Sequence, residues 1–207
     1  MSSSTFAVGS LEGLAALIAD RSLLRVVGDA DVVIVPTAAA FTGITESAVV
    51  IADVLDGYGF RVEALMAGDR IALSDPYFPR RIAEADVVIL GDGSALHARA
   101  VWRDSDVGRA IEASTSLIAI GSVATVLGDV MIDPRGGAPT TGLGYRSGAA
   151  LCRLASDEQM ARTRSLLARD VALVTLGETG IVHHDDNGWR VVAGDVVVTR
   201  GQDDATL

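Results

Sequence analysis

Short apolar runs that alternate with helical patterns restrict the fold of this chain more than any other sequence feature. Three runs are apolar throughout and of strand length: Val32–Val35, Val87–Leu90 and Leu117–Ile120. Such runs are typical of strands whose two faces are both covered. Because helical patterns separate them, the strands are expected to run parallel through right-handed crossovers. The first 130 residues therefore predict a doubly wound, mainly parallel α/β sheet with helices on both faces.

The pattern changes after about residue 133. Residues 134–144 are rich in glycine and predict a loop, and Asp186-Asn187-Gly188 is typical of a tight hairpin. The expected helices are 46–57, 79–85, 94–102, 106–113, 122–128 and 159–168. The other expected strands are 61–66, 171–175, 180–184, 189–192 and 196–199. The last four predict an antiparallel extension at the C-terminal end of the sheet.

Length and composition suit one globular unit. The 207 residues predict a single α/β domain over 1–207, with frayed tails at about 1–4 and 202–207. Hydrophobic residues make up 49% of the chain, which is enough for a sizeable core. The single cysteine, Cys152, excludes an intrachain disulfide and indicates a reducing, cytoplasmic location.

Charge and hydropathy exclude several classes of partner. The formal net charge of −10 argues against nucleic acid and anionic membranes. No apolar segment is long enough to cross a bilayer, and the N-terminus lacks the pattern of a signal peptide. The acidic residues are scattered and show no metal-ligating cluster. We therefore expect neither a metal nor another cofactor.

Candidate chemistry lies at the carboxyl ends of the predicted strands, where open parallel sheets bind ligands. Three turns follow such ends: Pro36-Thr37, Gly91-Asp92-Gly93-Ser94 and Gly121-Ser122. The last is placed where a nucleophile elbow would lie, with the glycine turn supplying N–H donors to an oxyanion. The alternative is that Ser122 merely caps a helix.

A serine nucleophile needs a base, and no histidine is clearly placed to serve. His97 is predicted as a partly exposed helix residue. His183 and His184 are adjacent in a predicted strand, so they point to opposite faces and are expected to be solvated. Cys152 is interpreted as a small core residue instead of a nucleophile.

An ordered series of short motifs resembles a known family. The series is VIVPTA (Val33–Ala38), ILGDG (Ile89–Gly93), AIGS (Ala119–Ser122), MIDPRGG (Met131–Gly137), GLG (Gly142–Gly144), LGETG (Leu176–Gly180), WRV (Trp189–Val191) and GDV (Gly194–Val196). It is similar to the serine peptidase family of aspartyl dipeptidase (dipeptidase E) and cyanophycinase over about residues 30–200. The resemblance implies a fold like that of class I glutamine amidotransferases, with a serine–histidine–acid triad and a strained serine elbow.

The positions that hold the catalytic residues in that family carry other residues in this chain. Aligned from Gly121, the family's nucleophile position holds Val123, and an alternative alignment places Ser122 there. The family's histidine position holds Arg153, and arginine stays protonated and cannot act as a base. Asp129 and Asp133 remain as candidate acids, and the oxyanion turn reads Gly91-Asp92-Gly93-Ser94.

Three hypotheses follow from these positions. The favoured one is a catalytically inactive member that acts as a binding or regulatory module. The second is an active serine-type peptidase or amidase that uses Ser122 on small peptides or isopeptides. The third is a structural subunit, which allows for a homodimer. If the cleft survives, Arg153 and Arg135 suit it to a small carboxylate or peptide ligand, whereas Arg99 is interpreted as a surface residue.

Overall fold

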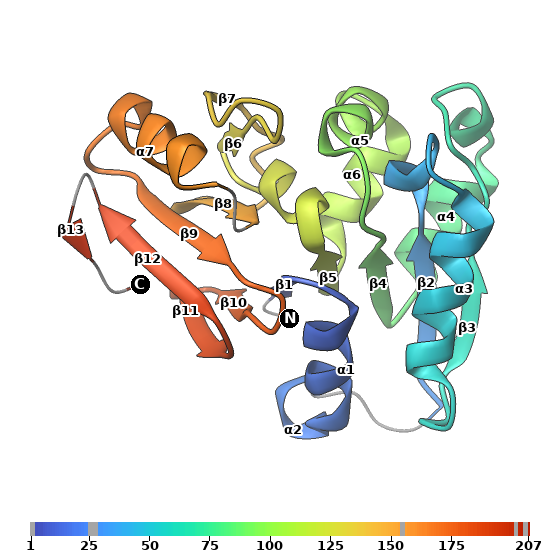
Figure 1. Cartoon of the computed structure of the whole chain (residues 1–207). Coiled ribbons are helices and arrows are strands. Elements are labelled where there is room, and N and C mark those ends of the chain that lie inside the picture. The colour runs from blue at the N-terminus through green and yellow to red at the C-terminus, as the bar shows by residue number, and fades with distance from the viewer. Residues whose placement is uncertain (1–2, 25–28, 154–155, 201–202, 205–206) are drawn as a thin grey trace.

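A seven-stranded sheet organises the chain (Figure 1). The computed structural model describes all residues except 1–2, 25–28, 154–155, 201–202 and 205–206. The strand order is β11-β10-β1-β5-β4-β2-β3, in which the last five strands are parallel to one another and β10 and β11 are antiparallel. Their bounds are β1 (Ser4–Val8), β2 (Asp31–Val35), β3 (Arg61–Ala64), β4 (Val87–Leu90), β5 (Ser116–Ile120), β10 (Ile181–Asp185) and β11 (Gly188–Ala193). The predicted α/β class and its antiparallel extension are confirmed.

Two core clusters cover the two faces of this sheet. Val32 and Ile34 of β2 pack with α1 (Leu11–Ala19), α2 (Arg21–Leu24) and α3 (Ile44–Leu55). Val33 and Val35 pack on the other face, as expected from the alternation of side chains along a strand. That face is covered by α4 (Tyr77–Glu84), α5 (Ala95–Trp102), α6 (Asp106–Ala113) and the 3-10 helix η3 (Gly121–Leu127). Among the described residues, no helix is long and apolar enough to cross a membrane.

A second sheet was not predicted. Its order is β13-β12-β9-β8, with β8 parallel to β9 and the other pairs antiparallel. The bounds are β8 (Ala149–Arg153), β9 (Ala172–Leu176), β12 (Val196–Arg200) and β13 (Asp203–Asp204), and α7 (Asp157–Leu166) connects β8 to β9. Two of the four strands predicted as one extension therefore belong to this separate sheet, whose first strand, β8, is rich in alanine.

Other differences occur where strands are very short or begin with polar residues. A two-stranded ribbon, β6 (Val130–Ile132) and β7 (Pro139–Thr141), replaces part of the loop predicted at 134–144. β1 was not predicted, and it begins at Ser4, inside the expected N-terminal tail. In the C-terminal tail, Asp203–Asp204 pair with β12, whereas residues 202, 205 and 206 lie outside the described residues. Two short 3-10 helices, η1 (Thr37–Ala39) and η2 (Ala72–Ser74), complete the structure.

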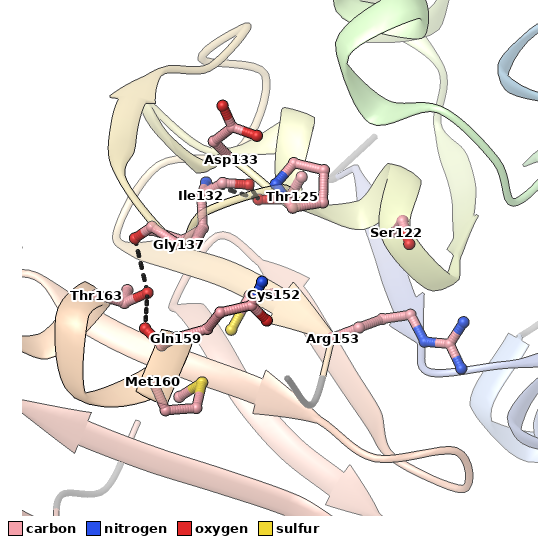
Figure 2. Close-up of a pocket in the computed structure, with 11 residues that line it drawn as sticks. Ser122, Thr125, Ile132, Asp133, Gly137, Cys152, Arg153, Gln159, Met160 and Thr163 are labelled. Atoms are coloured by element: carbon pink, nitrogen blue, oxygen red, sulfur yellow. Dashed lines mark hydrogen bonds between the residues drawn. The ribbon is translucent and has the colours of Figure 1, made fainter. Parts of the chain in front are cut away.

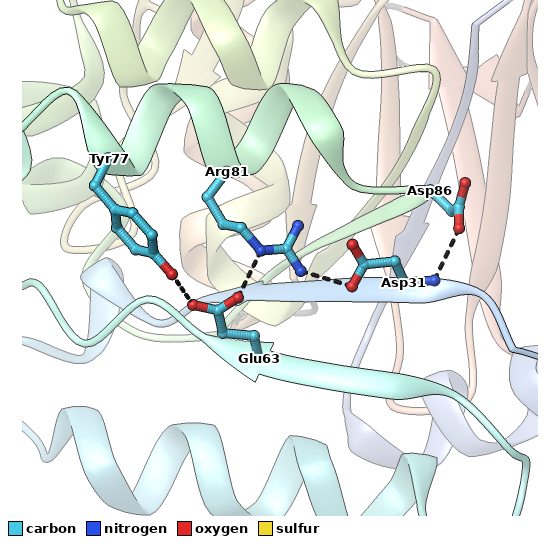
Figure 3. A network of polar contacts seen from close by, with 5 residues as sticks. All are labelled: Asp31, Glu63, Tyr77, Arg81 and Asp86. Atoms are coloured by element: carbon cyan, nitrogen blue, oxygen red, sulfur yellow. Dashed lines mark hydrogen bonds and ion pairs between the residues drawn. The ribbon is translucent and has the colours of Figure 1, made fainter.

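A polar network fastens α4 to the edge of the large sheet (Figure 3). Arg81 Nη2 lies 2.6 Å from Asp31 Oδ1 of β2, and its Nε lies 2.5 Å from Glu63 Oε2 of β3. The Tyr77 hydroxyl donates to Glu63 as well, and the Asp86 carboxylate accepts the Asp31 backbone N–H. One guanidinium thus links a helix to two neighbouring strands.

This network predicts a specific sensitivity to acid. The hydrogen bond from Tyr77 lowers the pKa of Glu63, and Arg81 lowers it further. Because the folded pKa lies below the unfolded value, the stabilisation is fully present above the unfolded pKa and is lost as the pH falls through the folded pKa. We expect the melting temperature of Glu63→Gln to lie below that of the wild type at pH 7 and to approach it at pH 3.

The exposed Glu84 supplies the control for that comparison, because its only described ion pair is a 4.0 Å contact with Arg80. Glu84→Gln should leave the melting temperature close to that of the wild type at both pH values. A gap between Glu63→Gln and the wild type that is equally large at pH 3 and pH 7 would contradict the expected linkage.

Candidate active-site region at the carboxyl edge

The carboxyl ends of the parallel strands bring the candidate turns to one edge of the sheet. Val8 of β1 pairs with Ile120 of β5, and Leu90 of β4 pairs with both Ala119 of β5 and Val35 of β2. The chain segments that follow these strands therefore emerge side by side. They include the two glycine-containing turns that the sequence indicated as an elbow and an oxyanion site.

The turn after β5 has the geometry of an elbow, but it is centred on a glycine. Gly121 has a φ of +62°, whereas Ser122 and Val123 are not among the described residues with positive φ. A Cβ atom at Gly121 would overlap with the carboxylate of Asp92. In a nucleophile elbow, the strained residue itself carries the nucleophile. Here that residue has no side chain.

The left-handed residue of this turn lies one position before Ser122 and two positions before Val123. Val123, the aligned nucleophile position, is fully buried in the core, so its side chain cannot reach a ligand. Ser122 follows the left-handed residue and lies inside η3. No side chain caps η3, so the alternative of Ser122 as a helix cap is wrong as well.

Asp92 connects the two turns. Its Oδ1 atom accepts the backbone N–H groups of Ser122 and Gly93, each at 2.7 Å. Its Oδ2 atom lies 3.4 Å from Nη1 of Arg153, which reaches over from the end of β8. Gly93 has a φ of +150°, and a Cβ there would overlap with the backbone of Ala38, so this turn requires glycine. A carboxylate is thus held by two amides and a guanidinium.

A cavity of about 250 Å³ lies beside this cluster, between η3, β8 and α7 (Figure 2). Ser122 and Arg153 line one end of it, and Gly137 and Thr163 lie at the opposite end (Figure 2). The remaining lining residues are Thr125, Ile132, Asp133, Pro134, Cys152, Gln159 and Met160. Arg153 therefore lies near the Ser122 turn, as expected, and places a cation at one end of a small cavity of mixed polarity.

Of the two candidate acids, Asp133 forms an ion pair with another residue and Asp129 lies outside the cavity. Asp133 is paired with Arg135, whose Nε and Nη2 atoms lie 3.2 and 3.1 Å from its two oxygens. Hydrogen bonds from the Arg135 side chain and backbone lower the pKa of Asp133, so Asp133 is ionised at neutral pH. Arg135 is exposed and is not among the residues that line the cavity. Asp129 lines a different groove, beside Gly142 and Tyr145.

All three histidines of the chain are engaged away from the cavity. Nε2 of His97 lies 2.5 Å from the carbonyl oxygen of Gly68. His183 is buried against Phe6, and its Nε2 lies 2.7 Å from Ser4 Oγ, so the prediction of a solvated side chain was wrong for it. His184 packs on Trp189 on the opposite face of β10. Ser122 consequently has no imidazole beside it.

The remaining candidates shape the site without supplying a nucleophile. Cys152 is buried, and this burial raises the pKa of its thiol, so the reactive thiolate is scarce at neutral pH. Ser94 caps α5 by accepting the N–H of His97. A Cβ at Gly91 would crowd the Ser47 hydroxyl. Within the described part of the chain, no group of three or more His, Cys, Asp or Glu side chains could hold a metal.

Sequence reasoning missed the far wall of the cavity. Thr163 donates its hydroxyl to the carbonyls of Gly137 and Gln159, which closes α7 onto the loop after β6. The helix itself was predicted, but no sequence pattern connects residues so far apart. The sequence also did not reveal that the Asp92 carboxylate accepts hydrogen bonds from both turns. It predicted only that the two turns lie close together.

Two solved structures have a fold similar to that of this chain. The chain resembles the crystal structure of a peptidase from an acI-B1 Actinobacterium, with a TM-score of 0.77 and 19% identity over 100% of this chain and 94% of that one. It also resembles a protein from Listeria monocytogenes EGD-e assigned as a peptidase E, with a TM-score of 0.66 and 11% identity over 97% of this chain and 99% of that one. No family model and no curated protein sequence matches the chain.

Proposed function

We propose that this chain is a peptidase-fold binding or regulatory module of the aspartyl dipeptidase and cyanophycinase type that has lost serine hydrolysis. The observation that carries the proposal is the left-handed Gly121 at the strand-to-helix turn, with the Asp92 carboxylate filling the adjacent space. A serine hydrolase presents its nucleophile from that turn. The cytoplasmic location, a homodimer and the absence of a cofactor stay predictions.

The base is missing as well as the nucleophile. Arg153 stands at the position that the family resemblance gives to histidine, and its guanidinium pairs with Asp92. Guanidinium donates hydrogen bonds and does not accept protons at physiological pH. Loss of either nucleophile or base lowers the rate of triad enzymes by roughly 10³-fold or more.

The cavity suits a small ligand that carries a carboxylate. Arg153 supplies a cation at one end of the cavity, and a guanidinium pairs well with a ligand carboxylate. A volume of about 250 Å³ is small for a ligand site, which favours a ligand the size of a dipeptide.

A covalent serine probe tests the loss of hydrolysis. We expect a fluorophosphonate to leave the wild type and Ser122→Ala equally unlabelled, under conditions in which an active serine hydrolase reacts fully. We also expect calorimetry to detect binding of an aspartyl dipeptide without release of its amino acids. Labelling that disappears in Ser122→Ala would overturn the assignment.

The second candidate is an active serine-type peptidase or amidase that uses Ser122. One observation favours it: the Ser122 side chain lines the same cavity as Arg153 (Figure 2). The hydroxyl would have to react without a neighbouring imidazole. The probe experiment separates the two candidates, because only this one predicts labelling and slow hydrolysis that both depend on Ser122.

A further inference from the structure

The Asp92 carboxylate is held in the way that a protein holds a bound anion. Two backbone N–H groups, from Gly93 and Ser122, converge on Oδ1 at 2.7 Å each. The Arg153 guanidinium lies 3.4 Å from Oδ2 on another side. Converging amides with a nearby cation are the arrangement that stabilises oxyanions and carboxylates in ligand sites. Here the occupant belongs to the chain itself.

The position of the carboxylate strengthens this interpretation. A Cβ atom built on Gly121 would fall on the Asp92 carboxyl group, so the carboxylate occupies the start of the space that an elbow side chain would fill. The N–H groups of Gly93 and Ser122 therefore point to the space next to Gly121, where a ligand group would be recognised. Ser122, which supplies one of these amides, also lines the cavity beside the cluster.

We propose that Gly93 N–H, Ser122 N–H and Arg153 form a carboxylate site that Asp92 occupies from within, and that a ligand carboxylate binds by displacing Asp92. The inference rests on the proposed function in one respect: the incoming carboxylate belongs to the ligand of the adjacent cavity. Asp92 thereby sets the affinity of that site.

The surroundings of Asp92 permit such an exchange. The side chains of Asp92 and Arg153 are each 37% exposed, so water and small anions reach both. Asp92 also lines a second cavity of about 290 Å³, which Ser47 lines as well and which gives a rotated carboxylate room. Glu178 lines that cavity too and repels a second carboxylate, which favours the inward position when no ligand is bound. The apparent affinity of a ligand is then reduced by the small fraction of open sites.

Chemical rescue tests the carboxylate site directly. Asp92→Gly removes the carboxylate and leaves a space that formate can enter. We expect this variant to melt at a lower temperature than the wild type and sodium formate to restore at least half of the loss in a saturable manner, compared with sodium chloride at equal ionic strength. Adding Arg153→Met should raise the formate concentration needed by roughly 10-fold.

Asp92→Asn is the matched control, because its amide oxygen still accepts both N–H groups while the charge is gone. Formate should leave its melting temperature unchanged. The aspartyl dipeptide should bind Asp92→Asn at least roughly 5-fold more tightly than the wild type by calorimetry, since a neutral amide is displaced from Arg153 more readily. This arm remains informative if Asp92→Gly does not fold.

The outcomes separate this inference from the proposed function. Equal effects of formate and chloride on Asp92→Gly, or an equal formate effect on Asp92→Asn, would overturn the carboxylate site. Dipeptide binding of equal strength to the wild type and Asp92→Asn would overturn the displacement and leave the proposed function standing. Formate rescue without dipeptide binding to any variant would support the carboxylate site and overturn the proposed function.

Discussion

Gly121→Ala is expected to lower the free energy of unfolding by about 3 kcal/mol, a large loss for a change of one methyl group. The φ of +62° costs a residue with a side chain roughly 1–2 kcal/mol. The added Cβ would also overlap with the Asp92 carboxylate, which must then give up its hydrogen bonds to Ser122 and Gly93. Because the Asp92 side chain is 37% exposed and water replaces part of the lost bonding, the two bonds together contribute about 1.5 kcal/mol. Urea denaturation measures the difference.

Gly57→Ala separates the two causes. Gly57 has a φ of +76°, and a Cβ there would meet no atom within 4 Å, so this variant should lose only the backbone contribution. The double variant Gly121→Ala with Asp92→Gly should recover about 1 kcal/mol relative to the sum of the single changes, because the overlap is gone. A loss at Gly121 no larger than that at Gly57 would show that Asp92 does not occupy the elbow.

Arg146→Met is expected to lower the free energy of unfolding by about 3–5 kcal/mol, because it leaves buried acceptors without their donor. Arg146 is only 5% exposed, and its Nε donates to Thr5 Oγ1 of β1 at 2.6 Å. Its Nη groups donate to the carbonyls of Glu112, Ser114 and Tyr145. Glu112 and Ser114 lie at the C-terminal end of α6, where unpaired carbonyls favour a cation.

An exposed arginine provides the comparison for Arg146. Arg109 is 66% exposed and pairs with Asp106 within α6, so Arg109→Met should change the free energy of unfolding by less than about 0.5 kcal/mol. Urea denaturation of both variants measures the contrast. Similar small losses in the two would mean that the loop carrying Arg146 rearranges and satisfies its acceptors with water.

The large sheet was predictable because its signals are local. The apolar runs at β2, β4 and β5 have the length of strands and lie between helical patterns, and the Asp186-Asn187 turn placed the β10–β11 hairpin correctly. The second sheet was missed because its first strand, Ala149–Arg153, is composed largely of small residues and follows a glycine-rich segment. Such a strand is stabilised by pairing with β9 and not by its own propensity.

The site was predictable only in outline. Adjacent strand ends correctly brought the Gly91–Ser94 turn to Gly121 and Ser122, because parallel strands end at one edge. Glycine adopts positive φ at the least cost, so Gly121 was the residue to expect there, but the family resemblance pointed to Ser122 and Val123 instead. The buried state of His183 depends on Phe6 and Ser4, which lie in a strand that the sequence did not predict.

The position of β1 between β5 and β10 has a consequence for how this protein folds during its synthesis on the ribosome. The strand at Ser4–Val8 is translated well before its partners, which begin at Ser116 and Ile181. Gly9, just after it, also bonds to Gly180. This strand must therefore remain unpaired until β5 and β10 have been synthesised. Such distant pairing slows maturation and makes nascent chains dependent on protection from aggregation.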